Sequence, residues 1–299
     1  MPSIKDLKKR IGTVKNTQQT TKAMKMVSAA KLRRAQEAIG NQRPYANGLR
    51  EMLTALLRAC GGQVKSPLLE REKPAAGHES KAALLVVTSD RGLCAGFNNN
   101  AIKFVSRWLK EEGARFGSVE VHFLGRRGYD FFKTKNVNVG GYYPELGGKV
   151  TFAKAKKMSR VLTDLYTSER VDEVFVLFNE FKNAASQRPV AERLLPVATD
   201  GATGGSSAPI DLGDPILKPS ASELAADLLE RNLPMQVFRI MLESQAGEHG
   251  ARMSAMENAT KNAGDMIRKL TLQYNKQRQA GITKELLEII SGSEAQKVS

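Results

Sequence analysis

Apolar residues recur at a seven-residue spacing along the first sixty residues and predict one long helix over residues 3–60. This segment contains a single proline, Pro44. The apolar stripe comprises two blocks: Ile4, Leu7, Ile11 and Val14, then Leu32, Ala35, Ile39, Ala46, Leu49, Leu53 and Leu56. A stripe held over so many heptads is typical of a coiled coil, which at 1.5 Å per residue would be about 80 Å long.

The stripe is polar between its two apolar blocks, where it consists of Gln18, Thr21, Lys25 and Ser28. A two-stranded seam with amide, hydroxyl and ammonium groups on it is expected to be locally weak. The pattern therefore indicates a stretch whose polar face is contacted by something besides the second helix.

The last eighty residues carry a second helical pattern. Ser220 and Glu223 have the spacing of a capping box, so a helix is expected to begin here, and Pro234 is expected to break or kink it. From Met235 the helical pattern continues to Ile290. Its seam is Met253, Met256, Thr260, Ala263, Ile267, Leu270 and Tyr274, followed by Ile282, Leu286 and Ile289. Gly247 and Gly250 are unfavourable in a helix, so a bend is expected near them.

Between the two terminal patterns, short apolar runs alternate with helical segments. Strands are predicted over residues 83–89, 119–125 and 171–178, with a further edge strand over 190–197; helices are predicted from about residue 98, over 126–136 and over 151–168. This alternation is typical of βαβ units in a mainly parallel sheet. The predicted fold class is α/β with long helices, in which an antiparallel coiled coil of the two ends carries an inserted Rossmann-like domain.

Turn-forming and charged residues over 61–80 and 200–219 predict linkers on both sides of this domain. The expected organisation is an N-terminal coiled-coil helix, an α/β domain and a C-terminal coiled-coil helix, over residues 1–60, 80–200 and 219–290.

The chain is strongly basic, with 46 Lys and Arg against 31 Asp and Glu and a net charge of +15. Thirteen of the basic residues and only three acidic ones fall within residues 1–58, so the charge belongs mainly to one element. An acidic partner is expected, either nucleic acid or an acidic protein surface. Tyr45 is the only aromatic residue of this segment and no DNA-reading motif is present, which disfavours nucleic acid.

The stretch TSDRGLCAGFNNN follows the predicted strand at 83–89, where nucleotide-binding folds place a phosphate loop. Gly92 and Gly96 do not match G-x-G-x-x-G, and the stretch lacks the G-K-[ST] ending of a P-loop. No base or second carboxylate lies nearby to complete an acid/base pair with Asp90 or Arg91. The stretch is therefore interpreted as a tight strand-to-helix turn, which argues against an α/β enzyme with helical arms.

The few cysteine and histidine residues do not predict catalysis or metal binding. Cys94 has no charged neighbour that would activate it and is expected to be a buried structural thiol. His249, close to Glu248 and Arg252, is expected to have a surface or interface role. Two cysteines and three scattered histidines make a metal site improbable, and no cofactor is expected. The chain has no signal-peptide-like start and no apolar run of about 18 residues, so we expect a reducing compartment and only indirect membrane association.

Three stretches resemble the γ subunits of F-type ATP synthases: NTQQTTKAMKMVSAAKLRRAQ, TSDRGLCAGFN and YNKQRQAGITKELLEIISG. They occur in that family's order, and the resemblance extends over nearly the whole chain. One departure is Ala95, which stands where the family usually has a second glycine. This replacement is expected to cost little if the φ angle of Ala95 is negative.

The resemblance implies the central rotary shaft of the enzyme. In that family the coiled coil stands inside a ring of three α and three β subunits. The α/β domain and the lower coiled coil sit on the membrane rotor ring of c subunits, beside the ε subunit. Nucleotide chemistry belongs to the β subunit, so the resemblance implies a subunit without an active site. It also implies a peripheral membrane protein on the cytoplasmic face of the bacterial inner membrane.

By matching motif, the resemblance also implies subunit-coupling contacts with mechanical and electrostatic roles. On the N-terminal helix these are Met24 and Lys25; on the C-terminal helix they are Arg252, Arg278, Gln279, Thr283, Glu285 and Glu288. No catalytic, cofactor-binding or metal-binding residue is implied.

Overall fold

A computed structural model describes residues 3–59, 64, 66, 68–69, 79–184, 186–197 and 220–298. It divides into two compact units, one of Met1–Ser28 with Met253–Ser299 and the other of Ala29–Arg252. We call these the terminal unit and the central unit. Most of the expected linker at 61–80 and nearly all of that at 200–219 lie outside the described residues. The predicted limits of the N-terminal helix, the α/β domain and the C-terminal helix, at residues 1–60, 80–200 and 219–290, stay a prediction.

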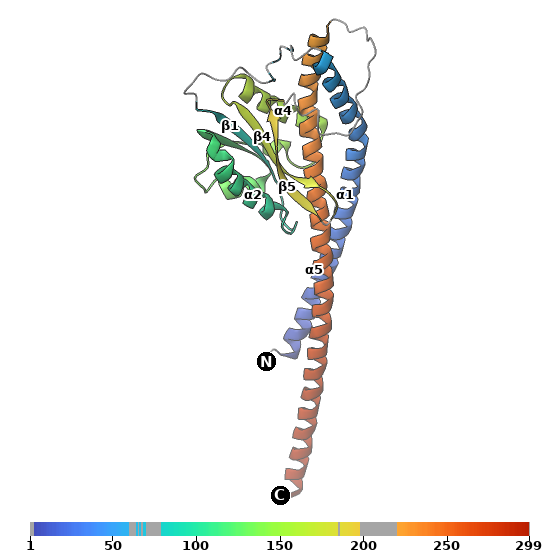
Figure 1. The fold of residues 1–299 in the computed structure, drawn as a ribbon. Helices are drawn as coiled ribbons and strands as arrows, with labels where there is room; N and C mark the ends of the chain where they lie inside the picture. The colour runs from blue at the N-terminus through green and yellow to red at the C-terminus, as the bar shows by residue number, and fades with distance from the viewer. Residues whose placement is uncertain are drawn as a thin grey trace. The chain divides into compact units, whose positions relative to one another are not determined.

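Both terminal helices are long and unbroken. Helix α1 spans Ile4–Ala59 and contains Pro44, and helix α5 spans Ala221–Val298 and contains Pro234 (Figure 1). The predicted capping box is confirmed at its first contact, since the backbone N–H of Glu223 donates to the Ser220 hydroxyl over 3.2 Å. The predicted break at Pro234 is wrong, because α5 continues through it. An interior proline costs about 3 kcal/mol, and here burial of the residues on either side, Leu233 and Val237, offsets it.

The central unit contains a five-stranded sheet in the order β3-β2-β1-β4-β5. Its strands are β1 (Lys81–Val87), β2 (Ser118–Leu124), β3 (Val139–Tyr142), β4 (Glu173–Phe181) and β5 (Gln187–Leu195). The first four strands are parallel and β5 is antiparallel to β4. The mainly parallel sheet and the edge position of β5 were therefore predicted correctly. Strand β3, with the sequence VGGY, was not predicted because its two glycines hide the strand pattern.

The helices between the strands cover both faces of the sheet. They are α2 (Phe97–Glu111), α3 (Arg126–Phe132) and α4 (Phe152–Thr167), with short 3-10 turns at Gly113–Arg115 and Pro144–Leu146. Helix α4 begins at Thr151, whose hydroxyl accepts a hydrogen bond from the backbone N–H of Lys154. These helices agree with the three that the sequence pattern predicts.

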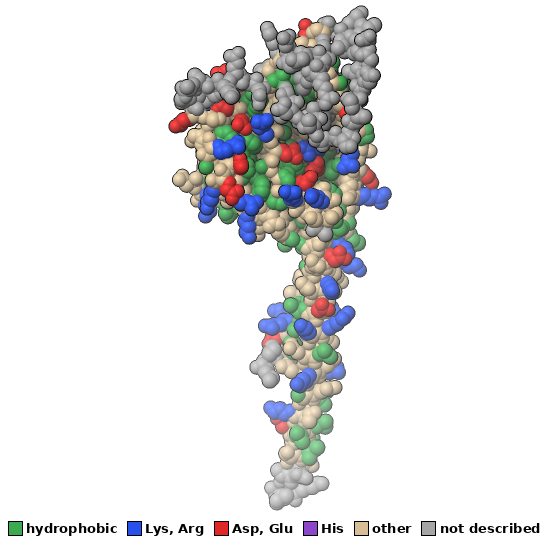
Figure 2. Space-filling model, in the orientation of Figure 1, with side chains coloured by type: hydrophobic (Ala, Val, Ile, Leu, Met, Phe, Trp, Pro, Cys, Tyr) green, Lys and Arg blue, Asp and Glu red, His purple; other side chains and the backbone are tan. Residues whose placement is uncertain are grey.

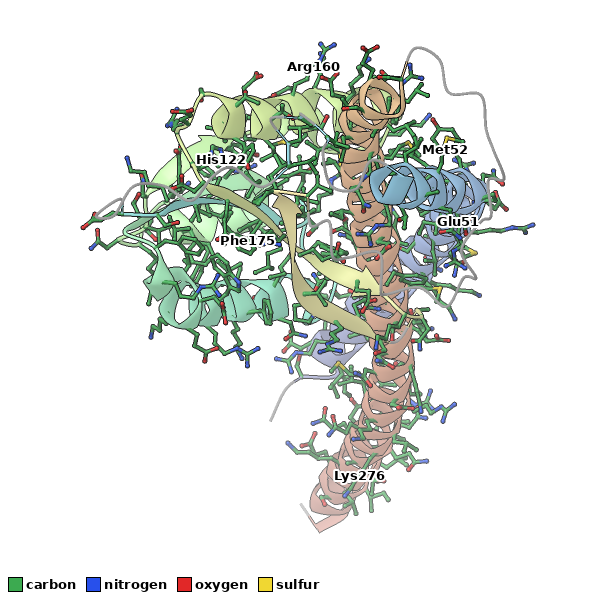
Figure 3. The ribbon with its side chains drawn as sticks, turned by 45° about the horizontal axis from the view of Figure 1, so that its top comes forward. Glu51, Met52, His122, Arg160, Phe175 and Lys276 are labelled. Carbon is green, nitrogen blue, oxygen red and sulfur yellow. The ribbon has the colours of Figure 1, made fainter. Side chains whose placement is uncertain are left out.

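Two apolar clusters hold the layers together. On one face, α2 and α3 pack against the sheet, with Trp108 and Phe175 at a ring distance of 5.1 Å (Figures 1 and 3). On the other face, α4 and the N-terminal part of α5 bury residues such as Met158 and Ile240, and Leu53 of α1 belongs to the same cluster. The sheet is therefore a middle layer, and part of α5 is built into the core of the central unit.

Candidate functional site

The turn after β1 has a self-contained hydrogen-bond network where a nucleotide-binding fold would hold phosphate. One carboxylate oxygen of Asp90 accepts the backbone N–H of Arg126 over 3.1 Å, and the other accepts that of Gly148 over 3.2 Å. Asn98 accepts the backbone N–H of Ser89 over 3.0 Å. The Asp90 carboxylate is therefore bound by the chain's own backbone, and its negative charge would repel a phosphate in this turn.

Helix α5 packs against the region where a doubly wound sheet usually binds its ligand, at the carboxyl ends of β1 and β4. The Asn179 amide donates to the backbone carbonyl of Phe97 over 3.2 Å and so joins β4 to the start of α2. A Cβ added to Gly247 would lie 3.1 Å from the Phe97 ring, and one added to Gly250 would lie 3.1 Å from the backbone of Ala184. These glycines therefore allow α5 to approach the sheet closely. This close approach explains why glycine stands at two positions inside a helix.

Arg252 joins α5 to the turn after β1. Its Nε and Nη2 atoms donate to the carbonyl oxygen of Gly92 over 3.3 and 3.1 Å, and Nη2 also lies 3.5 Å from the carbonyl oxygen of Arg91. Its Nη1 atom pairs with Glu248 over 2.7 Å, and only 9% of the residue is exposed. The guanidinium thus uses all of its donor nitrogens inside the chain. We name Ser89–Cys94 together with Glu248, His249 and Arg252 the α5 anchor.

Burial and positive neighbours set the charge states in the α5 anchor. Burial, together with Arg252 and Lys31, lowers the pKa of His249 to about 4. The neutral ring lies with Nδ1 3.4 Å from Nη1 of Arg252, so it can act as the acceptor. Burial raises the pKa of Glu248, and the Arg252 charge opposes that shift. His249 is therefore a neutral, buried interface residue; the surface position that the sequence left open is excluded.

The anchored turn is conformationally strained. Leu93 and Ala95 have φ angles of 63° and 47°, in the left-handed region, which costs about 1–2 kcal/mol for each non-glycine residue. The condition of a negative φ at Ala95 is therefore not met. Leu93 is also 62% exposed, whereas Cys94 beside it is 2% exposed and packs with Phe97 and Ala251 of α5. Cys94 is thus a buried thiol, as predicted.

In the terminal unit, α1 and α5 run antiparallel and meet through the polar part of the seam. The Thr260 hydroxyl donates to that of Thr21 over 2.8 Å, and Thr21 donates to the backbone carbonyl of Gln18 over 3.0 Å. The Gln18 amide donates to the Thr260 carbonyl over 3.4 Å, and Lys25 pairs with Glu257 over 2.6 Å. Three of the four polar seam residues of α1, Gln18, Thr21 and Lys25, therefore have partners on α5.

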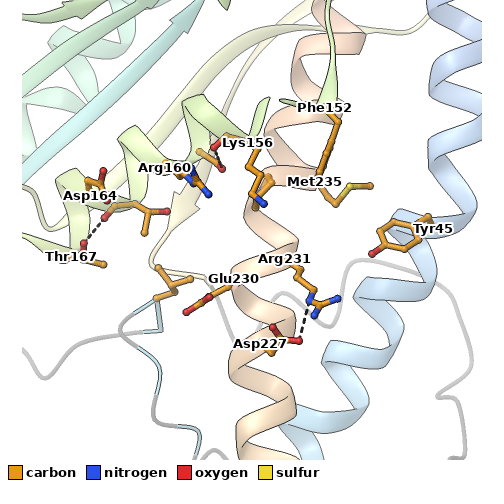
Figure 4. Close-up of a pocket in the computed structure, with 14 residues that line it drawn as sticks. Tyr45, Phe152, Lys156, Arg160, Asp164, Thr167, Asp227, Glu230, Arg231 and Met235 are labelled. Atoms are coloured by element: carbon orange, nitrogen blue, oxygen red, sulfur yellow. Dashed lines mark hydrogen bonds and ion pairs between the residues drawn. The ribbon is translucent and has the colours of Figure 1, made fainter. Parts of the chain in front are cut away.

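A cavity of about 840 Å³ lies in the central unit between α4 and α5 (Figure 4). Its walls carry Lys156 and Arg160 from α4, and Glu230 and an Asp227–Arg231 ion pair of 3.0 Å from α5. Acidic and basic side chains are mixed in it, so its charge does not favour a phosphate or a metal ion.

The chain is similar to known proteins over nearly its whole length. A sequence profile of the ATP synthase family, described as "ATP synthase", matches residues 3–296. The ATP synthase gamma chain of Anaeromyxobacter dehalogenans is 48% identical over 297 residues, which are 99% of this chain and 100% of that protein. The ATP synthase gamma chain of Geotalea uraniireducens is also 48% identical over 297 residues, with the same coverage.

The chain belongs to the ATP synthase gamma chain family.

Solved structures agree with this fold. The chain is similar to one in the rotor of the Euglena gracilis mitochondrial ATP synthase, with a TM-score of 0.61, 17% identity and coverage of 93% of this chain and 98% of that one. A second Euglena gracilis structure, which contains OSCP, F1 and the c-ring, gives a TM-score of 0.63 at 18% identity, over 98% and 94% of the two chains. The predicted gamma-chain resemblance and fold class are thus confirmed.

The coupling residues predicted from the gamma-chain resemblance are spread along the helices. Met24 is half-buried, and Lys25 is paired with Glu257. Farther along α5, exposed side chains follow one another at Arg278, Gln279, Thr283, Glu285 and Glu288. At 1.5 Å per residue, residues 257 and 278 of this gamma chain are about 30 Å apart along the helix. Arg252 belongs to the α5 anchor. The predicted coupling residues therefore fall into three separate groups: Met24 with Lys25, Arg252, and the residues from Arg278 to Glu288.

Sequence reasoning missed the carboxylate partners in this gamma chain. Asp90 was considered only for catalysis, and Glu257 was not singled out. The sequence feature that could have indicated the role of Asp90 is glycine next to its hydrogen-bond partners: Gly125 after β2, and Gly147 and Gly148 before α4. Gly125 has a φ of 113°, and a Cβ there would lie 2.1 Å from the Thr88 carbonyl oxygen.

No group of three His, Cys, Asp or Glu side chains among the described residues of this gamma chain could hold a metal ion. Within the same residues, no helix combines the length and apolar character that a membrane crossing requires.

Proposed function

We propose that this chain is the rotating central shaft of an F-type ATP synthase. It would couple ion flow through the membrane rotor ring to ATP synthesis or hydrolysis at the β subunits. The observation that carries the proposal is the antiparallel pairing of the two chain ends, through Thr21–Thr260 and Lys25–Glu257, in a member of the gamma chain family. Two intertwined helices resist twisting better than one, which suits a shaft under torque.

The proposed partners are the α and β subunits of the catalytic head, the ε subunit and the ring of c subunits. Basic residues support the head as an acidic-surface partner: Lys and Arg side chains are plentiful along the helices of the terminal unit (Figure 2), and the first 58 residues carry thirteen of them against three acidic residues. The membrane contact would be indirect, on the cytoplasmic face of the bacterial inner membrane.

We also propose that the chain has no active site of its own. The negative charge of Asp90 lies in the turn where a phosphate would bind, and α5 packs over the carboxyl ends of β1 and β4. The predicted coupling residues would act by contact and charge. Of these, Arg278, Gln279, Thr283, Glu285 and Glu288 have exposed side chains that are free to meet a surrounding subunit.

The test is ATP hydrolysis by α and β subunits of the same organism, with and without this chain, at several salt concentrations. Size-exclusion chromatography would follow assembly in the same samples. We expect a stable complex with one copy of the chain, steady turnover that depends on it, and weaker association at high salt because exposed charges are screened. A chain that neither joins the complex nor changes turnover would contradict the proposal.

A further inference from the structure

A buried histidine on β2 lies between a tyrosine and a carboxylate. The His122 side chain is 2% exposed (Figure 3). Its Nδ1 atom lies 3.0 Å from the hydroxyl of Tyr143, just after β3, and the two rings stack with their centres 6.0 Å apart. Its Nε2 atom has no hydrogen-bond partner among the described residues, and the Glu120 carboxylate lies 3.5 Å from it. A buried polar atom without a hydrogen bond is uncommon in proteins and requires a physical reason.

The Glu120 carboxylate faces two nitrogen groups with one oxygen. Its Oε1 atom pairs with Nη2 of Arg170 over 2.7 Å, and the same atom is the one that lies 3.5 Å from Nε2 of His122. The Glu120 side chain is 10% exposed and that of Arg170 is 60% exposed, so the arginine reaches the carboxylate from the surface. A proton on the ring would make His122 a second charged donor toward this oxygen. We name Glu120, His122, Tyr143 and Arg170 the β3 cluster.

The β3 cluster lies directly against strand β3. A Cβ added to Gly140 would lie 2.1 Å from Oε1 of Glu120, and one added to Gly141 would lie 2.7 Å from the Tyr143 hydroxyl. Strand β3 is at the edge of the sheet, and its register with β2 shifts next to His122, so that Gly140 is the extra residue of a bulge. Because a short, bulged edge strand has few ladder hydrogen bonds, contacts with the β3 cluster are an important part of what holds it on the sheet.

We propose that the β3 cluster is a proton-operated fastener of the sheet edge. With a neutral His122 ring the cluster is closed and β3 stays on β2, whereas uptake of a proton by this ring releases β3. The inference goes beyond the proposed shaft function and does not depend on any neighbouring subunit. It makes the edge of the α/β domain responsive to a fall in pH.

The surroundings of the ring favour its neutral form in the closed cluster. Burial lowers the pKa of His122 from its usual value of 6.5; the Glu120 charge opposes this shift and the Arg170 charge adds to it. In the released state the ring would meet water and regain its usual pKa. Since the open state then binds the proton more readily, the closed cluster is fully stable above pH 6.5 and loses stability as the pH falls below it.

The other titratable groups on this side of the sheet do not replace His122 in this role. Burial raises the pKa of Tyr143, and the Glu120 and Glu145 charges raise it further, so its hydroxyl stays protonated and can donate to the neutral ring. Helix α4 packs on the same face, and Tyr166 of that helix donates to a backbone carbonyl oxygen over 3.2 Å. Strand β1 places a leucine opposite the histidine. The charges that act on the ring are therefore those of Glu120 and Arg170.

Hydrogen–deuterium exchange of the β3 amides measures the release in the full chain, because exchange reports local opening. Protection of the peptide that contains β3 would be compared at pH 7 and pH 5, after correction for the pH dependence of exchange in an unfolded peptide. We expect protection in the wild-type chain to fall by at least about threefold at pH 5. In His122→Gln protection should be the same at both pH values, because glutamine takes up no proton.

Arg170→Gln tests the same mechanism with an exposed residue, so it is informative even if His122→Gln does not fold. The Arg170 charge disfavours a proton on the closed cluster, so its removal should raise the pKa of His122 and reduce the loss of protection at pH 5. Arg188→Gln is the matched control. Arg188 is an exposed arginine on β5, at the opposite edge of the sheet, and this variant should lose as much protection at β3 as the wild-type chain.

Three results would overturn the proposal. The first is constant protection of β3 in the wild-type chain, and the second is an equal loss at pH 5 in His122→Gln. The third is an NMR titration of the wild-type chain in which the His122 ring takes up its proton at or above pH 6.5. His249→Gln, which removes another buried histidine, should retain the wild-type loss at β3. All of these measurements use the isolated chain, so they stand or fall separately from the proposed shaft function.

Discussion

At the scale of single residues, burial decides chemistry that the sequence leaves open. His249 lies in a stretch with Glu248 and Arg252, and sequence spacing alone allows a base, a ligand or an inert side chain. The structure places its ring beside a guanidinium and away from solvent, and its pKa falls to about 4. A proton on this ring would be repelled by Arg252 and Lys31, so His249 stays neutral at physiological pH.

This shift predicts a pH dependence of stability. Because the pKa of His249 is lower in the folded chain than its usual value of 6.5, only the unfolded chain binds this proton between pH 6.5 and 4. The stability is fully present above pH 6.5 and falls as the pH drops toward 4, by at most about 3 kcal/mol.

Urea unfolding at pH 7 and pH 4.5 measures this loss, and His249→Gln should make it smaller. Glu248, whose raised pKa acts in the opposite direction, is unchanged in that variant and serves as an internal control. An equal loss of stability in the wild-type chain and in His249→Gln would contradict the assignment.

Ala95 gives a second prediction at this scale. Its φ of 47° lies where glycine is favoured, so Ala95→Gly should relieve strain and stabilise the chain by up to about 1 kcal/mol. Ala101→Gly, in the buried part of α2, should instead destabilise by about 1 kcal/mol or more. Thermal unfolding of both variants checks the opposite signs, and destabilisation by Ala95→Gly would show that the turn does not store this strain.

At the scale of elements, helix propensity and packing oppose each other along α5. Gly247 and Gly250 weaken the helix locally, but they let it approach Phe97 and Ala184. Packing outweighs helix propensity at Pro234 as well. The helix continues through this proline because its flanking residues are buried in the core of the central unit. The course of α5 in the central unit is therefore set by the sheet on which it packs.

Gly250→Ala separates these two effects. The added Cβ would lie 3.1 Å from the backbone of Ala184, which cannot rotate away, so we expect destabilisation by about 1–2 kcal/mol despite the better helix propensity. Gly40→Ala in α1 is the control, since nothing lies within 4 Å of its added Cβ. That variant should gain up to about 1 kcal/mol. Denaturant midpoints measure both, and stabilisation by Gly250→Ala would refute the close-packing account.

At the scale of the whole molecule, the chain uses its ends and its middle differently. The ends form a coiled coil in which Gln18, Thr21 and Lys25 pair with the second helix. The middle forms a sheet in which the Asp90 carboxylate accepts hydrogen bonds from the chain's own backbone. The exposed apolar residues Ile282, Leu286 and Ile289 continue the predicted seam beyond the polar part, with 50, 53 and 69% exposure. A shaft that turns against surrounding subunits would cover this surface in the assembly.

Arg278→Ala combined with Gln279→Ala tests the proposed shaft contacts. Both side chains are exposed, so the stability of the isolated chain should change by less than about 0.5 kcal/mol. Coupled ATP synthesis or assembly should fall severalfold, because a charge and an amide that meet the head are lost. Lys269→Ala, an exposed change on the same helix, is the control. Full synthesis by the double variant would count against these contacts.

The elements with strong periodicity could be predicted from the order of residues alone. The heptad stripe gave α1 almost to the residue, the alternation of apolar runs gave four of the five strands, and the motifs gave the family. These signals are local, since each depends on residues within a few turns of one another. Strand β3 escaped because Gly140 and Gly141 carry no side-chain pattern, although pairing with β2 holds them in the sheet.

Contacts between residues that are distant in sequence could not be predicted in this way. Asp90 accepts hydrogen bonds from the backbone of Arg126 and Gly148, and Arg252 donates to the carbonyl oxygen of Gly92. These partners are up to 160 positions apart in the sequence. Hydrogen bonds at such separations depend on how the sheet and α5 pack, and no local spacing encodes them. The charge state of His249 has the same origin, because desolvation is a property of the packed environment and not of the residue.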